Sequence, residues 1–262
     1  MIRYILLSIC FTTLLLSSHA NALTSDGAYS RVKSKKELNC GVIVQTPYFS
    51  RDQKGKPVGF TPDLFAEIAL RTGVRIKYTV VTGLNDVQKM LNTGKLDMMC
   101  TPLPSIPATS MKYLPGQPLT LDMVNVYTLA GTAGPGTAAE LNIPKYVFGG
   151  IEGELGALYT PILFPKAQSR VLREDTTPAQ MIADLKAKKS HYMILPDTAA
   201  ASLSQTYPGV LQPVLQKPLF QTAVKLFYPQ ASTRLYLNIE ATIDDMKMDG
   251  RLNTLLDRYG LQ

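Results

Sequence analysis

The sequence predicts an α/β protein made of two similar lobes, each with its own hydrophobic core. Apolar segments with the periodicity of strands and of helices alternate from residue 39 to residue 100, and the alternation begins again at residue 146. A run rich in Gly, Ala and Pro at residues 131–136 separates the two series and reads as a linker between them. The length of 262 residues is sufficient for two separate cores.

The first residues have the pattern of a secretory signal peptide. Arg3 precedes an apolar run at residues 4–16, and Ala20 and Ala22 place small residues where a signal peptidase cleaves. We therefore expect residues 1–22 to be removed, so that the mature chain is exported into the periplasm. Residues 23–37 are polar and basic, and they are predicted to form a loose arm.

The first series predicts strands at residues 39–44, 74–81 and 96–100. A helix capped by Thr61 or Asp63 and ended by Gly73 lies between the first two strands, and a helix at residues 85–91 follows the second. This order predicts a parallel sheet, in which ligands bind beyond the carboxyl ends of the strands, here after Val44 and Cys100. The five prolines within residues 101–118 argue against a regular helix there.

The second series predicts strands at residues 146–151, 168–173 and 192–195. A helix opens at Glu154, and another covers residues 177–187 with Thr177 as its cap and Pro178 in its first position. Residues 233–259 are predicted to be mostly helical, with a break at Gly250.

The composition argues against several classes of function. The net charge is +7, but the basic residues are scattered, which favours a solvated surface over nucleic-acid binding. The mature chain retains a single histidine and no C-x-x-C motif, so we expect no metal site and no cofactor. Cys40 and Cys100 either pair in an oxidising compartment or remain two buried thiols.

Several stretches, in order along the chain, resemble the family 3 extracellular solute-binding proteins, the periplasmic receptors of polar amino-acid ABC importers. They are residues 41–50, 52–60, 63–68, 90–97, 149–154 and 238–260. The resemblance implies a type II periplasmic binding protein-like fold, with two α/β lobes joined by a two-strand hinge. Lobe 1 would comprise residues 23–128 plus 223–262, and lobe 2 residues 129–222.

The same resemblance implies a ligand site in which an arginine holds the ligand carboxylate and an aspartate holds its ammonium group. The arginine would fall near Ala108 or Thr109, but no arginine occurs between Arg75 and Arg170, and Lys112 is expected to be solvated. Asp197 matches the aspartate. We therefore expect a small polar, amine-containing ligand and not an ordinary amino acid.

Eight residues are predicted to contact this ligand: Gln45, Tyr48, Leu84, Thr101, Leu103, Ser105, Glu154 and Asp197. Other roles stay open for some of them. Asp197 and Glu154 are also suited to cap helices, while Tyr48 and Leu84 are also suited to the core.

We expect a monomeric protein that is not an enzyme and that captures a small molecule for an ABC transporter permease. Two alternatives remain at this point. Secreted cyclohexadienyl dehydratases resemble these binding proteins, and Glu152 or Glu154 could serve as a general acid in such an enzyme. Other relatives serve a periplasmic redox system, so a ligand-free, partner-binding protein is the second alternative.

Overall fold

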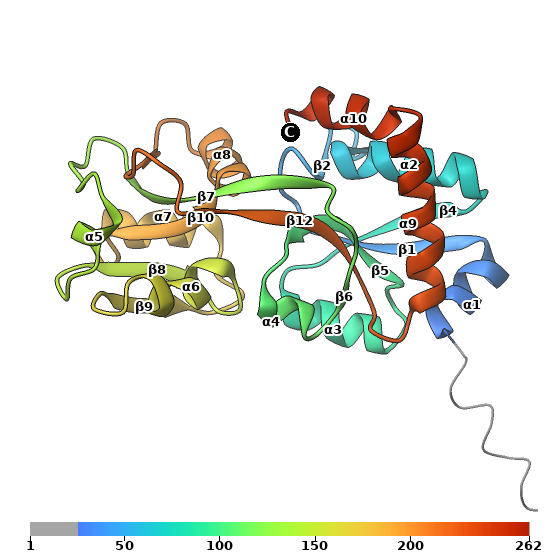
Figure 1. The fold of residues 1–262 in the computed structure, drawn as a ribbon, viewed down its shortest axis with the longest axis horizontal. Helices are drawn as coiled ribbons and strands as arrows, with labels where there is room; N and C mark the ends of the chain where they lie inside the picture. Colours follow the sequence, from blue (N-terminus) through green and yellow to red (C-terminus); the bar gives the residue numbers. More distant parts are fainter. Residues whose placement is uncertain (1–25, 262) are drawn as a thin grey trace, which may run out of the picture.

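The computed structural model describes residues 26–261, and for Leu84 and Asn85 it describes the backbone alone. Ten strands of the described chain form one sheet, and β2 (Ser50–Arg51) pairs with β3 (Pro57–Val58) separately. Figure 1 shows two lobes side by side, connected by two long strands. This arrangement confirms the predicted α/β fold class.

Lobe 1 contains the parallel strands β4, β1 and β5, with helices packed around them. Its elements are α1 (Gly27–Lys35), β1 (Glu37–Val42), α2 (Phe60–Thr72), β4 (Arg75–Val80), α3 (Leu84–Asn92), β5 (Met98–Pro104), α4 (Pro107–Ser110), β6 (Leu114–Pro115), α9 (Thr233–Met248) and α10 (Arg251–Tyr259). Both ends of the described chain therefore belong to this lobe.

Lobe 2 contains the parallel strands β10, β8 and β9. Its elements are α5 (Ala138–Leu141), β8 (Val147–Ile151), α6 (Leu155–Leu163), β9 (Gln168–Leu172), α7 (Pro178–Lys186), β10 (Tyr192–Pro196), α8 (Asp197–Thr206) and β11 (Leu211–Pro213). The predicted cap of α7 is confirmed, because the Thr177 side chain accepts a hydrogen bond from the Gln180 amide.

Two antiparallel strands, β7 (Thr120–Leu129) and β12 (Phe220–Tyr228), connect the lobes. β12 pairs with β5 of lobe 1 and β7 with β10 of lobe 2, so the sheet is continuous through the connection. The prediction of a glycine-rich linker at residues 131–136 was wrong, because those residues follow β7 and lead to α5. The lobe boundaries placed at residues 128/129 and 222/223 stay predictions.

The loose arm predicted at residues 23–37 was also wrong over its described part. Asp26 caps α1 by accepting a hydrogen bond of 2.8 Å from the Tyr29 amide, and its other oxygen accepts 2.7 and 3.0 Å bonds from the first amides of α9. Arg31 forms an ion pair of 3.0 Å with the fully buried Asp97. These contacts with distant segments, which local composition does not encode, order the helix.

Two helix predictions need smaller corrections. α2 begins at Phe60 after Gly59, so neither Thr61 nor Asp63 is its cap. The proline-rich segment does not exclude helix completely, since α4 is a single turn with Pro107 in its first position, where a missing amide hydrogen is harmless. In addition, β5 continues through Pro104, beyond its predicted end at Cys100.

Cys40 and Cys100 form a disulfide between the neighbouring strands β1 and β5, with a Cα–Cα distance of 5.3 Å. The structure thus decides between the two states that the sequence left open. Both cysteines are fully buried in the core of lobe 1, beside Leu38, Val42 and Met98. The disulfide fixes the two strands whose following loops approach lobe 2.

Candidate functional site: an acidic cavity between the lobes

A cavity of about 160 Å³ lies between the lobes. Its walls come from the loop after β1, the end of β5 and the turn after it, both hinge strands, and the first turns of α6 and α8. This volume is below the roughly 300–1,000 Å³ of pockets for drug-sized molecules, so the cavity suits a small ligand.

Tyr48 enters this cavity from the loop after β1. Gln45 and Phe49 hold the loop by exchanging backbone hydrogen bonds of 2.9 and 2.8 Å. Gly59 has a φ of 121°, and a Cβ atom there would lie 2.6 Å from the Tyr48 carbonyl oxygen, so only glycine permits this approach. The Tyr48 side chain is 2% exposed, yet its hydroxyl group has no hydrogen-bond partner.

A buried carboxylate faces the same space. Asp122 on β7 is 6% exposed, and it accepts a hydrogen bond from the Thr198 hydroxyl at the start of α8. Burial raises the pKa of Asp122 and the Asp197 carboxylate adds to this effect, while the bonds from Thr198 oppose it. Burial and then the nearby Asp122 also raise the pKa of Tyr48, and the neighbouring Thr198 side chain opposes them only in part, so the hydroxyl keeps its proton.

Asp197 lies behind this wall, at the first position of α8. Its Oδ1 atom accepts hydrogen bonds of 2.8 Å from both the Asn125 amide and the Tyr127 hydroxyl of β7. Asp197 therefore ties lobe 2 to the hinge strand, and its charge reaches the cavity beside Asp122.

Glu154 occupies another part of the wall, immediately before α6. The residue as a whole is exposed, yet protein packed around its carboxyl group removes water from it and raises its pKa to about 7, with a further contribution from the Glu174 carboxylate. Glu154 makes no side-chain bond to the helix amides, so the predicted capping role is not realised in hydrogen bonds. A carboxylate in this position disfavours an anionic ligand group at the helix N-terminus.

The structure brings four of the eight predicted residues to the cavity wall, namely Gln45, Tyr48, Leu103 and Glu154. Thr101 is fully buried behind it and accepts a 3.0 Å bond from the Ile43 amide, while the Ser105 hydroxyl faces Ser110 at 3.4 Å. Asp197 adjoins the wall residue Thr198, and the Leu84 side chain lies outside the described part of the chain.

Sequence reasoning missed Asp122 and Thr198, which both line the cavity. The available signal was a single carboxylate within the otherwise apolar and polar-neutral run at residues 119–129. At the place expected for an arginine, the wall holds Thr109, and Lys112 is exposed. None of the described wall residues is Lys, Arg or His.

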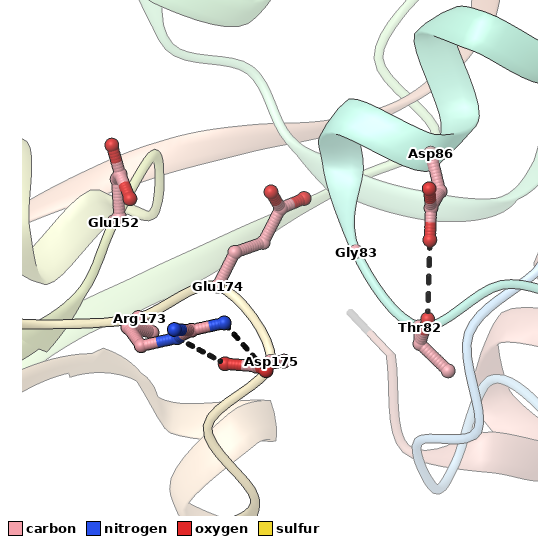
Figure 2. A pocket seen from close by; sticks show the side chains of 7 residues that line it. All are labelled: Thr82, Gly83, Asp86, Glu152, Arg173, Glu174 and Asp175. Atoms are coloured by element: carbon pink, nitrogen blue, oxygen red, sulfur yellow. Dashed lines mark hydrogen bonds and ion pairs between the residues drawn. The ribbon is translucent and has the colours of Figure 1, made fainter.

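A second, more open hollow of about 460 Å³ also lies between the lobes. Figure 2 shows Glu174 of lobe 2 extending towards Gly83 at the start of α3, while Arg173 and Asp175 form an ion pair with each other. A Cβ atom at Gly83 would lie 2.4 Å from the Glu174 carboxylate. Elsewhere the Thr46 hydroxyl donates a bond of 2.6 Å to Gln205 of α8, so the lobes touch in both places.

Other kinds of site are not evident within residues 26–261. No group of three His, Cys, Asp or Glu side chains in that range is arranged to hold a metal ion. No helix in the same range has the length and apolar character needed to cross a membrane.

Comparison with known proteins agrees with this architecture. A stretch of 93 residues is 30% identical to the "Probable histidine-binding protein" of Campylobacter jejuni subsp. jejuni, and the match spans 36% of each chain. A solved mutant of ArgBP from T. maritima aligns over 90% of this chain and 100% of its own, with a TM-score of 0.74 and 19% identity.

Two further solved structures share the fold. A putative ABC transporter binding component from Wolinella succinogenes, complexed with lysine, covers 87% of this chain and 97% of its own, with a TM-score of 0.73 and 18% identity. An ancestral amino acid-binding protein, a precursor of cyclohexadienyl dehydratase, covers 89% and 99%, with a TM-score of 0.73 and 17% identity.

The sequence profile of one family matches residues 38–262, which is nearly all of the described chain. The resemblance inferred from short motifs is thereby confirmed, and with it the type II periplasmic binding protein fold. The chain belongs to the bacterial extracellular solute-binding proteins, family 3.

Proposed function

We propose that this protein captures a small polar, amine-containing ligand between its two lobes and delivers it to an ABC transporter permease. The observation that carries the proposal is the charge of the cavity wall. Asp122 and Glu154 line it, and neither forms an ion pair within the described chain. A carboxylate in a cavity without an ion-pair partner can be stabilised by a cation, so a cationic ligand gains free energy by pairing with it.

The wall also argues against an ordinary amino acid. Recognition of an α-carboxylate depends on cationic or amide donors, and arginine suits it best because its guanidinium group binds both oxygens. The described wall has no basic residue, and Glu154 places an acidic group beside the first amides of α6. A ligand carboxylate would meet repulsion in place of a salt bridge.

The relatives support the cationic part of the proposal. The structure from Wolinella succinogenes contains lysine, and another solved neighbour contains arginine, so positively charged side chains occur among ligands on this fold. The disulfide between Cys40 and Cys100 is consistent with the oxidising compartment that the predicted signal peptide indicates. We propose that the mature protein acts as a monomer in the periplasm, and that it binds its ligand without changing it chemically.

Thermal unfolding of the mature protein tests this function. The panel comprises primary amines, amino acids, sugars and organic acids, each at a concentration well above the dissociation constant expected for a specific ligand. A compound that binds the folded state raises the melting temperature. We expect amines to raise it and organic acids to leave it unchanged. Tight binding of glutamate or aspartate would refute the proposal.

A further inference from the structure

The two acidic groups of the cavity belong to separate parts of its wall. Asp122 lies on hinge strand β7 beside Thr198, and the neighbouring carboxylate that influences it is Asp197. Glu154 lies at the start of α6, and the neighbouring carboxylate that influences it is Glu174. Each acidic side chain therefore interacts with a different neighbouring carboxylate, and the cavity has two separate acidic groups.

The remaining wall is largely apolar. Its aliphatic side chains come from the end of β5, the turn after it, the start of α6 and strands β10 and β12: Leu103, Ile106, Leu155, Ile194 and Val224. Such a surface favours hydrocarbon and offers no hydrogen-bond partner to hydroxyl or carboxylate groups. The cavity therefore combines two acidic groups with an aliphatic surface.

The Asp122 part of the wall has an additional, unsatisfied group. The Tyr48 hydroxyl is buried on this wall beside Thr198 but has no partner in hydrogen-bonding geometry, although a buried polar group normally has one. Its pKa is raised, so the hydroxyl is neutral, with a proton to donate and oxygen lone pairs to accept. An ammonium group has three donors, and Asp122 together with Tyr48 would accept two of them.

We propose that the cavity binds a linear diamine, with one ammonium group held by Asp122 and Tyr48 and the other by Glu154. This inference rests on the proposed function and narrows its ligand to a class. The hydrocarbon chain would lie against the aliphatic wall, and its length is limited by the volume of about 160 Å³. The carboxylate that an amino acid carries finds no basic side chain in this arrangement.

Isothermal titration calorimetry on the mature protein tests the class. The probes are putrescine and cadaverine, with butylamine and pentylamine as monoamines of the same chain lengths. We expect a diamine to bind at least about tenfold more tightly than its matched monoamine, which corresponds to ~1.4 kcal/mol. Equal binding of diamine and monoamine would refute the diamine inference but leave the proposed function intact. Absence of binding by any amine would refute both.

Two neutral variants locate the ammonium groups. Glu154→Gln and Asp122→Asn should each weaken diamine binding by about tenfold or more, since each removes one charge partner. The control is Glu152→Gln, an exposed glutamate two positions away that does not line this cavity. Equal losses in the control and in Glu154→Gln would overturn the assignment, as would unchanged diamine binding in both cavity variants.

Discussion

The Nδ2 atom of Asn125 donates a hydrogen bond of 2.8 Å to the Oδ1 atom of Asp197. Asn125 belongs to the hinge strand and Asp197 to the first turn of α8 in lobe 2, so this bond fixes the hinge against lobe 2. The aspartate that the family resemblance places in the ligand site therefore has a structural role, and mutation can separate this role from the ligand contact predicted for it.

Asp197→Ala removes the acceptor of the Asn125 and Tyr127 bonds, whereas Asp197→Asn retains an oxygen in the same place. We expect the alanine variant to lower the free energy of unfolding by about 2 kcal/mol and the asparagine variant to change it little. Urea denaturation measures both values. If Asp197 also supports an ammonium group through its charge, the asparagine variant will bind amines more weakly. Equal stabilities of the two variants would contradict the structural role.

Tyr48→Phe should have opposite effects on stability and on binding. Removing a buried hydroxyl without a partner should raise the free energy of unfolding of the ligand-free protein by about 1 kcal/mol. Amine affinity should fall, because the ligand loses an acceptor. The matched control is Tyr228→Phe, since the buried Tyr228 hydroxyl donates a 2.6 Å bond to Glu240, and its removal should destabilise the protein. A loss of stability in both variants would show that the Tyr48 hydroxyl is satisfied.

Stability should increase as the pH falls from about 8 towards about 5. Burial raises the pKa of Asp122 and Glu240, and the pKa of Glu154 rises from an ordinary 4.5 to about 7. A folded-state pKa above the unfolded value means that the folded protein binds more protons between the two values, so protonation favours folding there. Denaturation by urea across this pH range provides the measurement.

Glu154→Gln should flatten the part of this pH dependence that lies between the two pKa values of Glu154. Because solvent reaches Glu154, its contribution is smaller than that of a fully buried group. A stability that rises with pH over the whole range would contradict the upward pKa shifts.

Reduction of the Cys40–Cys100 disulfide should lower the free energy of unfolding by up to about 4 kcal/mol, because the bond closes a loop with a sequence separation of 60 residues. Comparing oxidised with reduced wild-type protein retains both side chains and isolates the effect of the covalent bond. Thiol titration of the unfolded, unreduced protein should detect neither cysteine. Two titratable thiols there would contradict the pairing.

Local signals predicted the fold well. The cap of α7 was predicted because the adjacent residues Thr177 and Pro178 encode it locally. Helix α1 was missed because its order depends on Asp97 and on the start of α9, which are distant in sequence. The linker was placed at residues 131–136 because that glycine-rich loop has a compositional signal, whereas the paired strands β7 and β12 that connect the lobes have none.

The candidate site was predicted only in part for the same physical reason. Tyr48 and Glu154 lie in motifs that the family resemblance covers, and both reach the wall. Asp122 was missed because its importance depends on burial against Thr198, which is 76 residues away. The sequence itself shows that no arginine occurs between Arg75 and Arg170, and this absence predicted a preference for cationic over anionic ligand groups.

The most direct test of the acidic cavity is a calorimetric comparison of lysine with cadaverine. Cadaverine differs from lysine only in lacking the α-carboxylate, so the pair isolates the interaction of the protein with that group. We predict that cadaverine binds at least about tenfold more tightly, which corresponds to ~1.4 kcal/mol. Lysine binding as tightly as cadaverine, or more tightly, would contradict a cavity that selects amines and rejects carboxylates.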